Sequence, residues 1–240
     1  MGRGSSKAGS GSAGAKNPKV EKTLSDIIRR TKNLKKEQYR VLDDDGNVIF
    51  TKKGDKGAVY MTVGEKREYL DNATTIHNHP NEEGIGGTFS SQDMSDFGYG
   101  AREIVVAAPE GTYRLRNLNH GTPQQKETWV EMRQELEKID AREQDKSFIQ
   151  RRDEAQKTLR NSKEVKLMDK YSKQWNEMRE KGASQEELKK VSDKYMKAQE
   201  TYKKRYKKIM RQQETKPYHD WLKKNAKKYG FEYTAPKGVY

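Results

Sequence analysis

The stretch Thr74-Thr75-Ile76-His77-Asn78-His79-Pro80 decides how this chain of 240 residues is organised, because it predicts a strand that ends in two histidines. Side chains alternate along an extended backbone, so two histidines one residue apart point to the same side. The stretch Phe89-Ser90-Ser91-Gln92-Asp93 follows one loop later and brings a carboxylate that can close on the same point. Two imidazoles, one carboxylate and a water molecule make a catalytic zinc site. The sequence therefore predicts Zn²⁺ bound by His77, His79 and Asp93.

Segments with a two-residue period on both sides of the histidine pair predict a sheet. Residues 39–42 and 47–50 flank an Asp-Gly turn and predict a β-hairpin. Ser90 has the composition of a helix start, with an acid in the first turn. Further strands are predicted over 58–63, 103–108 and 112–116. This order indicates an α+β fold, with a small mixed sheet and flanking helices over residues 34–120.

Outside this domain the sequence predicts helices and tails. After the domain, apolar residues recur every three or four positions on highly charged segments, which is typical of helices with narrow apolar stripes. An antiparallel hairpin is predicted over about 162–213, with a break at Gly182 and a capping box from Ser184 to Glu187. The predicted segments are a disordered Gly/Ser/Lys arm (1–18), a short basic helix (19–33), a charged helical region (121–217) and a basic aromatic tail (218–240).

Composition limits the classes of function. Only 31% of the residues are hydrophobic and 36% are charged, so one compact core cannot extend over the whole length. The absence of cysteine excludes disulfides, thiolate metal sites and a cysteine nucleophile. No apolar run approaches the roughly 20 residues of a membrane span, and the first residues lack the apolar stretch of a secretory signal. The expected location is cytoplasmic, with no membrane partner.

The net charge of +14 is unevenly distributed. Residues 1–40 hold 11 Lys/Arg against 3 Asp/Glu, and residues 201–229 hold 11 against 2, which gives net charges of +8 and +9. Both ends are basic and the remainder is not. Such ends favour polyanions, including nucleic acid, and they also serve as simple solubility devices.

The residues around the histidine pair resemble a known family. His77-Asn-His79-Pro80, Ser90-x-x-Asp93 and a strand that begins near Glu37 are similar to the JAB/MPN (JAMM) metalloprotease superfamily. The nearest members are bacterial and phage proteins of the RadC type, and domains attached to phage head-morphogenesis or minor structural proteins. The resemblance covers residues 37–118 and not the helical region. It implies a JAB/MPN-like mixed sheet for those residues, and the periodicity of the residues that follow predicts the helical, hairpin-like C-terminal region.

The resemblance also implies a role for each residue. It makes Glu37 the general base on a zinc-bound water and gives Ser90 a part in holding the oxyanion. Glu65 and Glu68 are alternatives for the base, in a stretch that the sequence presents as a polar turn. The implied zinc ligands are His77, His79 and Asp93.

The resulting hypothesis is a zinc-dependent hydrolase that cleaves a peptide or isopeptide bond. The resemblance suggests a phage or mobile-element protein of the host cytoplasm or virion, with a ubiquitin-like or phage structural protein as partner. The alternative is a catalytically inactive JAB-like structural or adaptor protein, such as a head-assembly component. In that alternative the basic ends bind nucleic acid or a protein partner.

Other interpretations of the same residues remain open. His-Asn-His-Pro is compatible with a plain strand-to-turn junction. The letters also suggest HNH nucleases, although that name describes residues dispersed over a ββα-metal unit. The loop between His79 and Ser90 is longer than the usual family spacing and is rich in glycine, whereas metal geometry tolerates errors of only about 0.2 Å. His120 and His219 have no partners at ligand spacing and are expected in solvent.

Overall fold

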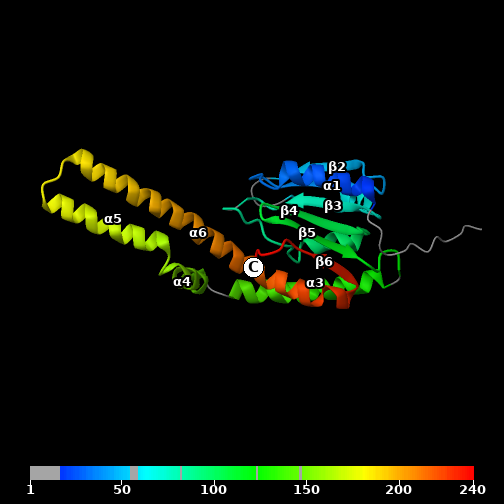
Figure 1. Ribbon diagram of the computed structural model, residues 1–240. Helices are drawn as coiled ribbons and strands as arrows, with labels where there is room; N and C mark the ends of the chain where they lie inside the picture. The colour runs from blue at the N-terminus through cyan, green and yellow to red at the C-terminus, as the bar shows by residue number, and fades with distance from the viewer. Residues whose placement is uncertain (1–16, 55–58, 82, 123, 146–147) are drawn as a thin grey trace, which may run out of the picture.

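The computed structural model describes residues 17–54, 59–81, 83–122, 124–145 and 148–240. Its centre is a six-stranded mixed sheet in the order β2-β1-β3-β4-β5-β6 (Figure 1). Only β3 and β4 run parallel, and all other neighbours are antiparallel. The predicted α+β class is thereby confirmed. The strands are β1 (Gln38–Leu42), β2 (Val48–Lys53), β3 (Thr74–Asn78), β4 (Glu103–Ala108), β5 (Gly111–Asn117) and β6 (Phe231–Thr234).

Helices cover both faces of this sheet (Figure 1). The α1 helix packs on one face, against apolar side chains that include Val105 and Ala107 of β4. The 3₁₀ helix η1, α3 and the last part of α6 pack on the other face, where Ile104 and Val106 point. The helices are α1 (Pro18–Thr31), α2 (Val63–Tyr69), η1 (Asp93–Tyr99), α3 (Gln125–Asp145), α4 (Phe148–Leu159), α5 (Lys163–Glu180), α6 (Gln185–Asn225) and η2 (Ala226–Tyr229).

The predicted β-hairpin is present and is fixed to α1 at its turn. Asp43 Oδ1 accepts hydrogen bonds from the backbone N–H groups of Asp45 and Asn47. Gly46 adopts a φ of +79°, and a Cβ there would lie 2.8 Å from the carbonyl carbon of Lys19. The turn therefore needs a glycine both for its left-handed backbone and for the close approach of the first turn of α1.

The strand predicted over 58–63 is wrong within the part that the structure describes, which begins at Val59. Val63 instead opens α2. Thr62 Oγ1 accepts from Glu65 N, and a Glu65 carboxylate oxygen accepts from Thr62 N, so the two residues form a capping box. Residues 59–63 are mostly β-branched or aromatic, which favours a strand in the sequence and concealed this helix start. The predicted disordered arm lies outside the described residues, apart from Asn17, which caps α1, and Pro18.

The predicted helical hairpin is formed by α5 and α6, which are antiparallel and project away from the sheet (Figure 1). The expected capping box is present, because Ser184 and Glu187 exchange side-chain and backbone hydrogen bonds. The α6 helix continues past the expected end at 213 and runs back along the domain to Asn225. Among the described residues no helix is both long and apolar enough to cross a membrane.

The C-terminal residues complete the sheet instead of forming a separate tail. Residues 218–225 belong to α6, and β6 pairs with β5 so that Phe231 lies opposite Asn117. Phe231 is fully buried and packs edge-on against Phe97 of η1, with ring centroids 4.8 Å apart. The basic aromatic segment predicted over 218–240 is thus a structural part of the domain.

If β6 closes the sheet, removal of its buried aromatic ring destabilises the whole domain. We expect Phe231→Ala to lower the free energy of unfolding by about 3–5 kcal/mol, because it leaves a cavity in the apolar cluster between the sheet, η1, α3 and α6. Urea unfolding followed by circular dichroism measures the change. Tyr60→Ala, at a side chain that is 62% exposed, serves as control and leaves the midpoint near that of the wild type. Equal midpoints for both variants would contradict the docking of β6.

Candidate metal centre

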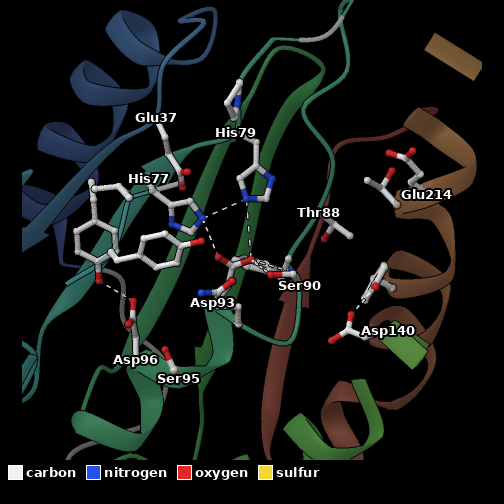
Figure 2. A pocket seen from close by; sticks show the side chains of 18 of the residues that line it. Glu37, His77, His79, Thr88, Ser90, Asp93, Ser95, Asp96, Asp140 and Glu214 are labelled. Atoms are coloured by element: carbon white, nitrogen blue, oxygen red, sulfur yellow. Dashed lines mark hydrogen bonds and ion pairs between the residues drawn. The ribbon is translucent and has the colours of Figure 1, made fainter. Parts of the chain in front are cut away.

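Three polar side chains meet at the end of β3. His77 is the penultimate residue of β3, His79 follows the strand, and Asp93 begins η1. The Nε2 atoms of the two histidines lie 3.2 Å apart. Asp93 Oδ1 lies 3.1 Å from Nε2 of His77, and Asp93 Oδ2 lies 3.9 Å from Nε2 of His79. Figure 2 shows both imidazoles pointing toward the carboxylate. The structure therefore brings together the three residues that the sequence singled out as ligands.

These separations suit a tetrahedral metal ion. Ligands at about 2.0–2.1 Å from a tetrahedral zinc lie about 3.3–3.4 Å from one another. The three measured separations, between 3.1 and 3.9 Å, bracket that value. The donor set of two neutral imidazoles and one carboxylate is also one that zinc accepts. The side chains thus fit a zinc ion with a further position open for water.

The charges of the three groups depend on one another. Burial lowers the pKa of His77, but the Asp93 carboxylate outweighs burial and, with Glu37, raises that pKa to about 9. Burial, with the positive charges of His77 and Arg211, lowers the pKa of His79 to about 4 although Asp93 opposes it. Burial would raise the pKa of Asp93, yet His77 and His79 hold it well below its usual range. The two imidazoles and the carboxylate therefore share one proton beyond those of the neutral imidazoles, and a divalent cation can replace that proton.

Ser90 holds the carboxylate in place. Its backbone N–H and its hydroxyl both donate to Asp93 Oδ2, over 2.7 and 2.9 Å. The other oxygen of Asp93 remains directed at His77. The predicted α-helix start at Ser90 is here a short 3₁₀ helix that begins at Asp93. In this geometry the hydroxyl of Ser90 orients a candidate ligand, which is a different task from the oxyanion contact that the resemblance implied.

The ring of His77 is fixed by its surroundings. It stacks on the ring of Tyr39, with centroids 6.0 Å apart. The Tyr39 hydroxyl donates to Asp96 Oδ2 over 2.6 Å, and the same carboxylate pairs with Lys66 at 3.0 Å. Nδ1 of His77 is buried without a hydrogen-bond partner among the described residues. Stacking on Tyr39, together with the contact between Nε2 and Asp93, thus fixes the orientation of this imidazole.

Glu37 is the candidate base that the structure places at the cluster. It precedes β1, is 8% exposed, and directs its carboxylate toward His77 (Figure 2). Glu65 binds Lys52 Nζ with both oxygens and caps α2, so it has a structural role. Glu68 is exposed on α2. Of the three glutamates considered, only Glu37 lines the cleft in which the histidines lie.

Asn78, between the two histidines, positions the segment that carries Glu37. Its side chain points to the opposite side of the strand and is fully buried. Asn78 Oδ1 accepts from Gln38 N over 2.8 Å, and Asn78 Nδ2 donates to the carbonyl oxygen of Lys36 over 3.2 Å. The asparagine therefore holds the residues on both sides of Glu37. From the sequence alone, this asparagine is expected only at a strand-to-turn junction.

The cluster opens into a cleft of about 650 Å³ whose far side is helical. Figure 2 shows Asp140 and Glu214 across the cleft from the histidines. Sequence reasoning missed this side because its residues come from three helices and share no motif. The helical wall, as we call it, consists of Asp140 of α3, Arg151 of α4 and Met210, Arg211, Glu214 and Thr215 of α6.

The other two histidines do not join the cluster, but His219 is not in solvent as expected. It is 8% exposed, its Nδ1 lies 3.0 Å from the Tyr233 hydroxyl, and its ring stacks on Tyr240. Burial lowers its pKa. His120 is half-buried, with Nε2 at 3.1 Å from the carbonyl oxygen of Gly100. The packing of the C-terminal segment, which the sequence does not reveal, accounts for the wrong expectation at His219.

Comparisons with protein-family models, with curated proteins and with solved structures give no significant match to this chain.

Proposed function

We propose that the protein is a metal-dependent hydrolase of the JAB/MPN type that cleaves a peptide or isopeptide bond. The observation that carries the proposal is the approach of His77, His79 and Asp93 at the edge lengths of a tetrahedral zinc site, in an open cleft. Bound Zn²⁺ would lower the pKa of a coordinated water to about 7 and so supply hydroxide at neutral pH.

The placement of the other residues supports this assignment. Glu37 borders the histidines from the start of β1, where a carboxylate can accept a proton from an attacking water and pass it to the leaving amine. Ser90 fixes the third candidate ligand, and its contact with an oxyanion would require the hydroxyl to turn from Asp93 toward the substrate. An amide is the substrate class that uses all of these groups.

The shape of the cleft favours an extended substrate. The candidate ligands His77, His79 and Asp93 lie between the end of β3 and the helical wall. The volume of the cleft, about 650 Å³, admits a few residues of peptide. A phage or mobile-element setting, and a ubiquitin-like or phage structural protein as partner, are proposals that rest on the resemblance of the motifs.

One observation favours the adaptor as a second candidate. The solvent side of α6 carries eight exposed lysines, which outnumber the exposed carboxylates among them, such as Glu186 and Glu200. An excess of positive charge on a projecting helix attracts polyanions such as nucleic acid. This surface lies on the helical hairpin, away from the metal cluster (Figure 1). The lysines are Lys189, Lys190, Lys194, Lys197, Lys203, Lys204, Lys207 and Lys208.

Metal content tests the proposal directly. We expect about one zinc per chain in protein purified without an affinity tag, and none in His77→Ala/His79→Ala, because that variant retains a single ligand. Inductively coupled plasma mass spectrometry measures the zinc content per chain. His120→Ala removes a histidine remote from the cluster and should keep its zinc. A wild type that stays free of zinc at neutral pH, even when zinc is supplied, would exclude the hydrolase and favour the adaptor.

If Glu37 acts only as an acid and base, its substitution should lower the rate of hydrolysis without affecting zinc binding. Glu37→Gln should retain zinc and lose about 10²–10⁴-fold in rate, since the amide cannot accept the proton. Fluorogenic peptides and lysine-linked isopeptides are the substrates for the assay. Glu68→Gln makes the same chemical change on the exposed side of α2 and should leave the rate unchanged. Equal loss in both variants, or no loss in Glu37→Gln, would remove Glu37 from the mechanism.

The affinity for zinc should rise with pH. The pKa of His77, raised to about 9, means that the metal-free protein holds a proton there at pH 7.5, which zinc must displace. His79, with its pKa lowered to about 4, has none to release. We expect the apparent affinity to rise with pH, with nearly two protons released per zinc at pH 7.5, one from His77 and most of one from the coordinated water. Titration calorimetry in buffers of different ionisation enthalpy counts these protons, and a count of one or fewer would contradict the presence of a proton on His77 in the metal-free protein.

A further inference from the structure

We propose that Glu110 is a positioning residue that sets the orientation and tautomer of His79 by clamping Gly86 and Gly87, with α6 closing the clamp from the other side. The proposal deepens the proposed function, on which its relevance to metal binding rests. Glu110 lies outside the motif around the histidines, in the turn between β4 and β5.

The first link joins His79 to the glycine loop. Nδ1 of His79 lies 3.1 Å from the carbonyl oxygen of Gly87. A carbonyl oxygen only accepts hydrogen bonds, so this contact requires the proton on Nδ1. The lone pair of the neutral ring is then on Nε2, which faces His77 and Asp93. The position of one carbonyl group therefore decides whether His79 presents a donor atom to a metal.

The second link joins the loop to Glu110. Its two carboxylate oxygens accept from Gly86 N over 2.7 Å and from Gly87 N over 2.8 Å. When one carboxylate binds two adjacent N–H groups, it fixes the plane of the peptide between them and the position of the loop relative to Glu110. The Tyr113 hydroxyl donates to the same carboxylate over 2.9 Å, so the clamp is anchored on β5.

The third link comes from α6. Arg211 Nη2 donates to the carbonyl oxygen of Gly86 over 2.9 Å. Gly87 has a φ of +90°, and a Cβ there would lie 2.3 Å from Thr215 Cγ2. The loop thus passes between Glu110 and α6 with no space for a side chain at Gly87. A segment with the composition of a flexible loop is held on both sides by elements distant in the sequence.

The clamp answers a physical requirement of the site. Metal ligands must be held to within about 0.2 Å, and loss of an outer hydrogen bond to a ligating histidine typically costs 10–100-fold in metal affinity. His79 lies outside the ladder of β3, so the strand alone does not fix its ring. The Gly87 carbonyl supplies the missing constraint, and Glu110 holds that carbonyl in place.

The test uses the full chain and Glu110→Gln, whose amide can accept from only one of the two N–H groups. Co²⁺ serves as a spectroscopic probe of the site. We expect 10–100-fold weaker Co²⁺ binding, a changed visible absorption spectrum of the complex, and a melting temperature of the metal-free protein close to that of the wild type. Glu83→Gln, in the same loop, removes a carboxylate that pairs with Lys207 and should bind Co²⁺ like the wild type.

A second measurement does not depend on metal. Two-bond ¹H–¹⁵N spectra of the imidazoles in metal-free protein at neutral pH report the tautomer of His79. We expect the proton on Nδ1 in the wild type and in Glu83→Gln, and a mixture of tautomers in Glu110→Gln. Arg211→Gln, which weakens the clamp from the α6 side, should shift the tautomer in the same direction but less.

The outcomes separate the two proposals. A wild type that binds no Co²⁺ would refute the metal site, while the tautomer comparison would still decide the clamp. An unchanged tautomer in Glu110→Gln would overturn the clamp, even if the wild type binds metal with the expected affinity. Weaker Co²⁺ binding in Glu110→Gln with an altered tautomer would support both.

Discussion

The site depends on the burial of β3 between two partners. All five of its residues are buried, and it pairs with β1 on one side and with β4 on the other. In this register His77 lies opposite Tyr39 and Val106. A slip of one residue would turn both histidines to the face that α1 covers and take Ile76 out of its apolar contacts there, so the alternation of side chains along β3 fixes the direction of the two histidines.

From this constraint follows the position of the candidate base. Because His77 and His79 face the cleft, the asparagine between them faces the other way, where it reaches the backbone on both sides of Glu37. His77-Asn78-His79 thus has two structural roles, one on each side of the chain. One side provides two imidazoles, and the other anchors the carboxylate that stands beside them.

The sequence predicted features that depend on local patterns and missed those that depend on distant contacts. The β1–β2 hairpin, β4 and the α5–α6 hairpin have periodicity, turn residues or a capping box within a few positions. A capping box at Thr62 marks α2, but the β-branched residues around it outweighed that signal. The strand β6 has only four residues, and its partner β5 lies more than 100 positions earlier in the chain. The helical wall of the cleft has no local signal at all.

The long glycine loop shows why local reasoning underestimates this site. An insertion rich in glycine adds conformational freedom next to His79, a candidate metal ligand, which by itself argues against a precise geometry. Here the freedom is removed by Glu110 from the sheet and by Arg211 and Thr215 from α6. The absence of side chains then becomes necessary, since only glycine fits against Thr215 at position 87. The same α6 that constrains the loop also extends into the projecting hairpin, so the helical region is a physical part of the site and not an independent appendage.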